Sequence, residues 1–407
     1  MTTAIDARRG LLQVYRSALA AVDGRARVRD FLTSRAPATR RVIAIGKAAA
    51  AMTLGAFDAG GVERALVITK HGHGDPRLGD RATILEAGHP LPDAASLAAG
   101  RAMLEFIHSA PPHQPFLFLI SGGASALAEV LPSGMTLKHL ARLNAWLLGA
   151  GLDIAAMNRV RKRFSCIKQG RLALALADRP TLCLLLSDVP GDDPAVIGSG
   201  PLVPDPEMAA PLPPFPDEVM ALSAQCVPPP TGDDPCFASI EIHVLASNRD
   251  ARTAAAQAAA RHGWPVVVHD TLLTGDVADA ARLVTQTLEA SAPALHVWGG
   301  ETTVRLPPAP GRGGRCQHLA LLAARAIAGR DDISLLAAGS DGSDGPGEDA
   351  GALVDGHTVQ RGEDENFSLT ESLTHADAGS FLEASGDLIT TGPTGTNVMD
   401  LVLGLRV

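Results

Sequence analysis

The residues best suited to chemistry lie in glycine-rich loops that directly follow short apolar runs. The apolar run 116–120 ends in Ser121, Gly122, Gly123 and Ser125. Two glycines allow a sharp turn, and hydroxyls beside free backbone N–H groups at a helix start are suited to holding an anion such as phosphate. Because many α/β proteins need a glycine turn here whether or not they bind anything, this loop alone favours neither interpretation.

The C-terminal half repeats the pattern of a glycine-rich polar loop. The members are Gly299, Gly300 and Glu301 after the apolar run 294–298, and Thr394 and Asn397 in the hydroxyl-rich loop 391–397. Because the pattern recurs, it becomes less convincing that each glycine-rich loop is only a structural turn.

Two basic residues lie in turns of the kind that commonly bind anions. Lys47 stands between the predicted strand 41–45 and an alanine-rich helix, and Arg315 opens a predicted helix after Gly313 and Gly314. A lysine at such a turn can reach a phosphoryl group as a mobile point charge, although most surface lysines do not. At the positive end of a helix, both a guanidinium group and the free N–H groups can face an anion.

Asp188 and Asp192 follow the apolar run 181–186. Ligands in open α/β sheets gather at the carboxyl ends of strands, and carboxylates there can hold magnesium directly or through water. Aspartate beside glycine and proline is more often a turn former, which is the alternative for each residue taken alone.

Six basic residues crowd one short segment of an otherwise acidic chain. They are Arg159, Arg161, Lys162, Arg163, Lys168 and Arg171, in a protein of net charge −9. The acidic balance argues against a general nucleic-acid surface, so the cluster favours a pocket for a small anion. A solvated helix face is the alternative, although such a face would usually carry interspersed acids.

Helical and strand-like segments alternate along the chain, which predicts an α/β fold with a parallel sheet covered on both faces. At 407 residues, two domains are expected. A proline-rich stretch within 190–235 predicts a stiff linker. We therefore expect a Rossmann-like domain over residues 1–235 and a second α/β domain over residues 236–407, with a first amphipathic helix around residues 11–22 assigned to the former.

The remaining composition narrows the protein class. Five cysteines without Cys-x-x-Cys spacing fit a reducing compartment better than a disulfide framework or zinc site. No uninterrupted apolar run reaches the roughly 18 residues of a membrane-spanning helix, and the start lacks an export signal. We expect a cytoplasmic protein with no membrane or nucleic-acid partner.

Together the loops, cations and aspartates suit phosphoryl transfer. Its transition state chiefly requires positioning and neutralisation of spreading negative charge. The sequence has no Gly-x-x-x-x-Gly-Lys-Ser/Thr motif and no protein-kinase set, which argues against both of those superfamilies. No Gly-x-Gly-x-x-Gly follows the first strand, which argues against a dinucleotide site.

Eight ordered motifs resemble the glycerate 2-kinases with a MOFRL domain over nearly the whole chain. The motifs are Ile45-Gly-Lys-Ala48, Ile120-Ser-Gly-Gly-Ala-Ser-Ala126, Asn158-Arg-Val-Arg-Lys162, Leu186-Ser-Asp-Val189, Gly198-Ser-Gly-Pro201, Gly299-Gly-Glu-Thr302, Gly313-Gly-Arg315 and Thr391-Gly-Pro-Thr-Gly-Thr-Asn397. The resemblance implies a MOFRL-type second domain, a site in the cleft and ATP-dependent phosphorylation of D-glycerate at its 2-hydroxyl. It also implies a magnesium requirement and essential roles for Lys47 and Arg315.

On this basis each candidate residue receives a hypothetical role. Lys47 and Arg315 neutralise the transferring group, and Asp188 or Asp192 holds Mg²⁺ or accepts the hydroxyl proton. Arg161 and Lys162 bind the glycerate carboxylate. The nucleotide-binding set comprises Ser121, Gly122, Gly123, Ser125, Gly299, Gly300, Glu301, Thr394 and Asn397. Either a monomer or a homodimer is expected.

The chain departs from the family pattern at a few positions. Cys316, Gln317 and His318 stand where Asn-Gln-Glu is expected, and Met399 precedes Asp400 where Asn-Asp is expected. These changes are expected to affect substrate choice or rate rather than fold.

Three alternatives remain open at this point. The chain is a kinase for another small hydroxy acid, a non-catalytic sugar-acid-binding relative, or a serine hydrolase built on Ser125. The last lacks the second glycine of a nucleophile elbow. Members of this family have also been labelled hydroxypyruvate reductases, which the missing dinucleotide pattern argues against.

Overall fold

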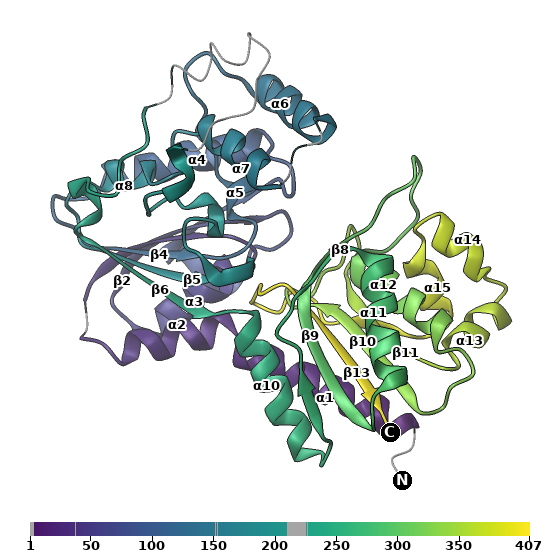
Figure 1. Cartoon of the computed structure of the whole chain (residues 1–407). Coiled ribbons are helices and arrows are strands. Elements are labelled where there is room, and N and C mark those ends of the chain that lie inside the picture. The colour runs from purple at the N-terminus through teal and green to yellow at the C-terminus, as the bar shows by residue number, and fades with distance from the viewer. Residues whose placement is uncertain (1–3, 37, 151, 153, 210–224, 226) are drawn as a thin grey trace. The chain divides into compact units, whose positions relative to one another are not determined.

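The computed structural model describes residues 4–36, 38–150, 152, 154–209, 225 and 227–407. The chain forms two compact units (Figure 1). Gly24–Leu245 forms one, which we call the parallel-sheet unit. The residues before Gly24 join Ala246–Val407 in the other, which we call the mixed-sheet unit.

The parallel-sheet unit contains a six-stranded sheet of order β3-β2-β1-β4-β5-β6. The strands are β1 (Arg40–Ile45), β2 (Val62–Lys70), β3 (Ala82–Ala87), β4 (Phe116–Ile120), β5 (Thr181–Leu186) and β6 (Ile240–Ala246). From β3 to β5 every neighbouring pair is parallel. β4 and β5 are buried along their whole length, as expected of parallel strands covered on both faces.

Helices cover both faces of this sheet (Figure 1). α2 (Gly24–Thr33) packs on α3 (Ala49–Ala59), which covers β1, β2 and β4. On the opposite face lie α4 (Ala94–His108), the short α5 (Ala124–Leu127) and α8 (Arg171–Leu176). α6 (Leu137–Gly149) and α7 (Ile154–Arg163) share a smaller apolar cluster of their own. The layered arrangement places the ends of β1, β4 and β5 at one edge of the sheet.

The mixed-sheet unit contains a sheet of order β12-β11-β10-β13-β9-β7, and β8 also pairs with β9. The strands are β7 (Val266–Val268), β8 (Leu273–Asp276), β9 (Ala294–Thr303), β10 (Ile333–Gly339), β11 (Asp349–Asp355), β12 (Leu388–Thr390) and β13 (Asp400–Arg406). β7 and β8 run parallel to β9, whereas β13 pairs antiparallel with both β9 and β10. The second sheet therefore differs from the steady parallel pattern of the first.

Helices again cover the sheet. α1 (Ala4–Ala21) and α10 (Asn248–Arg261) pack together on one face. The other carries α11 (Val277–Ala290) and α12 (Arg315–Ala326), with α13 (Thr358–Asp364), α14 (Leu369–Thr374) and α15 (Ala378–Ala384) beside α12. The core between α11, α12 and the sheet contains Trp298, the largest fully buried side chain.

The predicted fold class is confirmed, but the observed division differs from the predicted boundary at residue 235. α1 belongs to the mixed-sheet unit because its apolar face, including Leu11, Val14 and Ala18, packs on α10, β10 and β13. After the proline-rich segment the chain returns to the first sheet as β6, so the division falls at residue 245. Within that segment, residues 210–224 and 226 lie outside the described residues.

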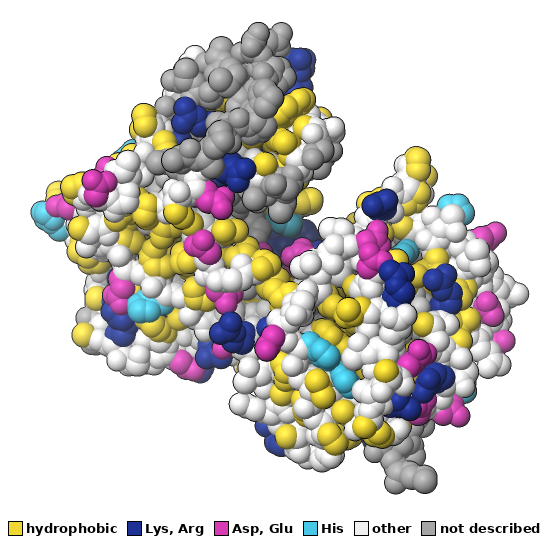
Figure 2. Space-filling view, in the orientation of Figure 1, with side chains coloured by type: hydrophobic (Ala, Val, Ile, Leu, Met, Phe, Trp, Pro, Cys, Tyr) yellow, Lys and Arg dark blue, Asp and Glu magenta, His cyan; other side chains and the backbone are white. Residues whose placement is uncertain are grey.

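The surface of the described residues is mixed in charge. On the face drawn in Figure 2, basic side chains of the described residues lie beside acidic ones rather than in one broad basic surface. Among the described helices, none combines the length and apolar character needed to cross a bilayer.

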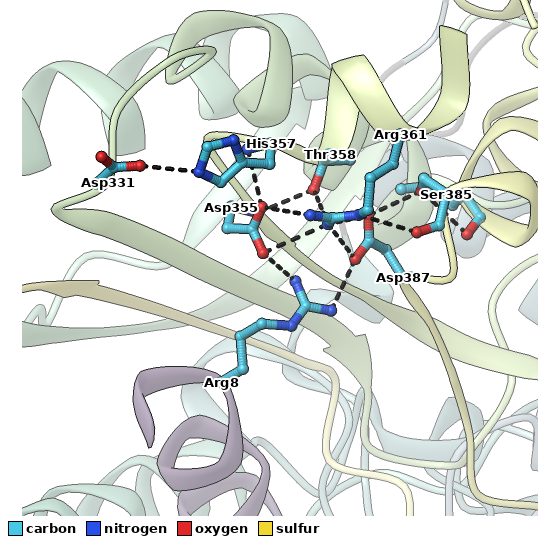
Figure 3. Close-up of polar contacts among 9 residues, drawn as sticks. Arg8, Asp331, Asp355, His357, Thr358, Arg361, Ser385 and Asp387 are labelled. Atoms are coloured by element: carbon cyan, nitrogen blue, oxygen red, sulfur yellow. Dashed lines mark hydrogen bonds and ion pairs between the residues drawn. The ribbon is translucent and has the colours of Figure 1, made fainter. Parts of the chain in front are cut away.

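Four charged side chains fasten α1 to the mixed sheet (Figure 3). Arg8 donates to Asp355 at 2.6 Å and to Asp387 at 2.7 Å, and Arg361 donates to the same two carboxylates at 3.0 and 2.7 Å. Burial alone would raise the pKa of Asp355, but the two guanidinium groups outweigh it and hold the pKa below its ordinary value. The network compensates two buried acids and ties the N-terminal helix to the C-terminal half.

Replacing Asp387 with alanine is expected to destabilise the protein. The change removes one of the two buried carboxylates that Arg8 and Arg361 share and leaves both guanidinium groups on Asp355 alone, and breaking a buried pair costs about 3 kcal/mol or more. Urea unfolding followed by tryptophan fluorescence measures the loss. Asp279→Ala is the control, because Asp279 pairs with Arg282 on an exposed face and its loss should cost under about 0.5 kcal/mol. Equal effects of the two variants would contradict the network's role.

Candidate active site

Lys47 and Ser121 are brought together because their strands are neighbours. β1 and β4 pair in parallel, so the turns after Ile45 and Ile120 emerge side by side. The Ser121 hydroxyl is buried and accepts a hydrogen bond of 3.0 Å from the Ala48 N–H. The Lys47 N–H donates to the Gly122 carbonyl at 2.9 Å. The two turns are thus joined by main-chain and hydroxyl contacts into one polar surface.

Two glycines of these turns are required by close approach. Gly46 has φ +132°, and a Cβ there would lie 2.2 Å from the Ser121 Oγ. Gly123 has φ +86°, and a Cβ there would lie 3.0 Å from a ring carbon of His89 and 3.5 Å from the Lys47 Cγ. His89 therefore lies against the loop beside Lys47. Sequence reasoning had no signal for this contact beyond a His-Pro pair after a predicted strand.

Ser125 contacts a second polar loop. Its hydroxyl lies 2.8 Å from that of Ser199, which belongs to the Gly-Ser-Gly-Pro motif 198–201. α5 begins after Gly123, as predicted, but it is only four residues long. A helix this short has only a small dipole, so an anion at its start would depend on the hydroxyls, the local N–H groups and Lys47.

Asp188 and Asp192 follow β5, the neighbour of β4, at the same edge of the sheet. Both side chains are partly exposed, and Asp192 adopts φ +56° in its turn. In the described part of the chain, no cluster of three or more His, Cys, Asp or Glu side chains is arranged to hold a metal. One or two carboxylates at a strand edge nevertheless fit Mg²⁺, which commonly takes its other ligands from water and substrate phosphates.

Half of the basic cluster proves to be structural, which corrects the predicted anion pocket. Lys162 is buried, and its Nζ donates to Asp205 at 2.8 Å and to the Ala195 carbonyl at 2.9 Å. Lys168 is buried and paired with Glu129 at 2.6 Å. These cations compensate buried acids from distant segments, which local spacing cannot reveal. Arg171 is also buried and donates to backbone carbonyls.

Arg161 differs from its neighbours in the same cluster. Its guanidinium donates to the Asn144 amide oxygen at 3.1 Å and to that of Asn158 at 3.4 Å. Burial lowers its pKa below the ordinary value for arginine. Because these partners are neutral amides, the bonds orient the guanidinium without compensating its charge. Arg161 thus keeps the electrostatic character expected of a carboxylate ligand, whereas Lys162 does not.

In the mixed-sheet unit, Arg315 begins α12 and is held by two carboxylates. Its Nε and Nη2 donate to Asp400 at 2.6 and 2.9 Å, and its Nη1 lies 2.9 Å from Glu301. Burial would lower the pKa of Arg315, but Asp400 and Glu301 outweigh it and raise the pKa. The Asp400 side chain is 8% exposed and that of Glu301 is 47% exposed, so Glu301 is the more accessible partner.

Close packing explains why residues 299 and 300 are glycines, and the sequence did not indicate this packing. A Cβ at Gly299 would lie 1.7 Å from the Asn248 Oδ1, and one at Gly300, at φ +148°, would lie 2.1 Å from the Leu273 carbonyl oxygen. Both glycines therefore permit β9 to approach α10 and β8. This packing orders Glu301 beside Arg315 whether or not the glycines themselves touch a ligand.

The loop 391–397 is joined to the loop after β10 through Ser340. The Thr394 hydroxyl donates to the Ser340 carbonyl at 2.5 Å, and the Val398 N–H donates to the Ser340 hydroxyl at 2.7 Å. Asn397 is buried. Ser340 thus supports Thr394 and Val398, the residue after Asn397, and this loop lies just before Asp400 in the chain.

The unusual residues Cys316 and Met399 are buried rather than displayed on a surface. The Cys316 and Gln317 N–H groups donate to Asp344 at 3.0 and 2.8 Å, which caps the start of α12. Burial raises the pKa of Asp344 to about 6, with Asp400 adding to the rise while the two N–H bonds oppose it. Sequence reasoning missed Asp344 as a helix cap because it lies well beyond α12 in the chain.

The geometry defines an α/β protein with phosphate-suited turns at the ends of parallel strands and an arginine fixed by acids in a second unit. Family models match at residues 10–212, described as a domain of unknown function (DUF4147), and at residues 294–400, the MOFRL family. D-glycerate 2-kinase from Thermotoga maritima is 34% identical over 380 residues, covering 90% of each chain.

A further protein and a crystal structure resemble this chain over nearly its whole length. A protein of Agrobacterium vitis with the provisional name of hydroxypyruvate reductase is 35% identical, covering 98% of this chain and 94% of its own. A crystal structure of Thermotoga maritima glycerate kinase matches with a TM-score of 0.83 and 31% identity, covering 99% and 100% of the chains. The chain belongs to the glycerate 2-kinase family with a MOFRL domain.

Replacing Gly46 with alanine is expected to destabilise the parallel-sheet unit. The Cβ clash with Ser121 and the positive φ together should cost about 2–4 kcal/mol, measured by thermal or urea unfolding. Gly149→Ala is the matched control, because Gly149 ends α6 with open space around its Cβ position. Comparable stability of the Gly46→Ala variant and wild type would show that the turns need not approach so closely.

The Asp344→Asn variant is expected to change the pH dependence of stability. A carboxyl group whose folded pKa is raised from 3.8 to about 6 contributes stability at low pH that is lost as pH rises through that window. Asparagine cannot titrate. The free energy of unfolding of the variant, relative to wild type, should therefore rise by roughly 1 kcal/mol between pH 5 and 7.5. A constant difference across this range would contradict the raised pKa.

Proposed function

We propose that this protein is an ATP-dependent glycerate 2-kinase, which transfers the γ-phosphoryl group of ATP to the 2-hydroxyl of D-glycerate. The observation that carries the proposal is the junction of the Lys47 turn with the Ser121–Ser125 loop at the carboxyl edge of a parallel sheet. Ligands of open α/β sheets bind at this edge. Membership in a family that includes a named D-glycerate 2-kinase supplies the substrate.

In the parallel-sheet unit, Lys47 supplies positive charge beside hydroxyls and N–H groups. Ser121 is committed to bonding Ala48, so its role is to hold the turn. Ser125, Gly122 and Gly123 are proposed to meet the nucleotide phosphates with Lys47. This division of roles separates a group that shapes the site from groups that bind the ligand.

In the mixed-sheet unit, Arg315 supplies the second positive charge. Asp400 holds two of its nitrogens, and the accessible Glu301 holds the third. A phosphate oxygen can replace the Glu301 carboxylate because both offer a planar guanidinium the same charge-assisted bond. We propose that Gly299, Gly300, Thr394 and Asn397 support this loop toward the nucleotide.

Magnesium and the acceptor complete the proposal. Asp188 or Asp192 would hold Mg²⁺, which would supply neutralisation of the phosphate charge. One of the two carboxylates takes the proton that leaves the 2-hydroxyl as the O–P bond forms and ADP departs. Arg161 binds the glycerate carboxylate, while Lys162 anchors the segment around Ala195. The enzyme is expected in the cytoplasm, as a monomer or homodimer.

The name of the Agrobacterium relative makes hydroxypyruvate reduction the second candidate. Such a reaction needs a nicotinamide cofactor, and the first strand-to-helix turn has the sequence Gly-Lys-Ala-Ala instead of a dinucleotide pattern. NADH oxidation in the presence of hydroxypyruvate tests this candidate directly, and none is expected.

The kinase proposal predicts that Lys47→Met lowers turnover about 10²- to 10³-fold, because a preorganised charge at the developing transition state is lost. Product is coupled to enolase, so that only 2-phosphoglycerate gives phosphoenolpyruvate. Lys138→Met, on an exposed face of α6, is the control and should retain full activity. Full turnover by folded Lys47→Met or Arg315→Lys would remove that residue from the mechanism, and no product from the wild type would refute the proposal.

A further inference from the structure

We infer that Tyr15, on the N-terminal helix, is a positioning residue for Arg315, an inference that rests on the proposed kinase function. Nothing in the sequence motifs points to α1, and sequence reasoning assigned it to the other domain. Yet α1 packs against β10 and β13, the strands whose ends carry the Arg315 site. Tyr15 is also the chain's single tyrosine.

The Tyr15 hydroxyl reaches the last residue of β10. Tyr15 is 1% exposed, and its hydroxyl donates a hydrogen bond of 2.7 Å to the Gly339 carbonyl. The same carbonyl accepts a longer bond of 3.4 Å from the Gly342 N–H, so the phenol is its closer partner at the end of the strand. The contact joins residues 324 positions apart.

Gly339 in turn lies opposite the residue that holds Arg315. Gly339 is paired with Asp400 across the antiparallel ladder. A Cβ added at Gly339 would lie 3.5 Å from the Asp400 Oδ1, the oxygen that accepts from the Arg315 Nη2 at 2.9 Å. The end of β10 is therefore next to this carboxylate, and we expect a shift of the Gly339 peptide to alter the position of the guanidinium group.

The residue after Gly339 supports the second loop of the site. Ser340 accepts from the Val398 N–H and from Thr394, and its own N–H donates to the Met399 carbonyl at 3.1 Å. Fixing Gly339 thus fixes the base of the loop 394–399 as well. One phenol supports both the arginine and the hydroxyl-rich loop.

The surroundings keep the phenol in its donating form. Burial raises the pKa of Tyr15, and Cys316, Asp341 and Asp400 raise it further. At the far end of the same helix, Arg8 fastens α1 to Asp355 and Asp387 (Figure 3). Arg8 and Tyr15 therefore hold α1 to the mixed sheet at two separate points along the helix.

Tyr15→Phe keeps the ring and removes only the hydrogen bond. The Gly339 carbonyl loses its shorter hydrogen bond and keeps the 3.4 Å contact from the Gly342 N–H, and kcat is expected to fall about tenfold while the KM for D-glycerate changes less than about twofold. The enolase-coupled assay gives both constants, and a melting curve gives the folded fraction. A purely structural role would instead lower the melting temperature and leave the kcat of the folded enzyme unchanged.

Arg8→Gln is the matched control, because it loosens the same helix away from Gly339. It is expected to lower the melting temperature with kcat unchanged. An active wild type whose kcat is unaffected by Tyr15→Phe, or is affected equally by Arg8→Gln, overturns the inference. An inactive wild type refutes the proposed function instead, so the two failures are distinguishable.

A second measurement does not depend on the phenylalanine variant folding. Because Tyr15 is the only tyrosine, 3-fluorotyrosine supplied during expression labels this one position. Its single ¹⁹F resonance is expected to move when Arg315→Lys is introduced and to stay in place in Lys138→Met. An unmoved resonance in Arg315→Lys would show that Tyr15 and Arg315 are not linked.

Discussion

The ion pair between Arg315 and Asp400 is the interaction on which the mixed-sheet unit's candidate site depends. Asp400 is buried at the start of β13, and a buried carboxylate is tolerated only when its charge is compensated. The bidentate bond meets that need and at the same time fixes the start of α12 against the sheet. Glu301, Gly339 and the loop before Asp400 are all arranged around this pair. The site arginine is therefore also a structural residue, so its conservative replacement is more informative than its removal.

The parallel-sheet unit positions its candidate groups by a different physical means. Parallel pairing places the ends of β1, β4 and β5 at one edge, and the main-chain N–H groups of Ala48 and Lys47 join the turns by donating to the Ser121 hydroxyl and the Gly122 carbonyl. The charged groups proposed for this unit are the side chains of Lys47 and Arg161 and the two aspartates. The proposed kinase therefore combines a guanidinium group held by two carboxylates in one unit with a lysine ammonium group in the other.

The sequence predicted what local patterns determine, and the rest depends on contacts between distant residues. β4 and β5 coincide with predicted apolar runs, and the glycine turns lie where predicted, because a run and its turn are neighbours in the chain. The structural role of Lys162 was not predicted, since Asp205 lies 43 positions away. The membership of α1 in the mixed-sheet unit was also missed, because an amphipathic face does not specify which sheet it covers. Periodicity and spacing therefore do not reveal which distant charged residues pair in the interior or which sheet a helix covers.

The replacement of the expected asparagine by Cys316 can be understood from the same electrostatics. Burial, together with Asp400 and Asp344, raises the pKa of Cys316 well above its ordinary value, so the side chain remains a thiol. A thiol still offers a hydrogen-bond donor toward Asp400, although a weaker one than an amide. The bond to Asp344 comes from the main chain and does not depend on the side chain. The substitution therefore preserves the helix start and leaves Asp400 bound mainly by Arg315, which makes the arginine's orientation more dependent on the strand ends beside it.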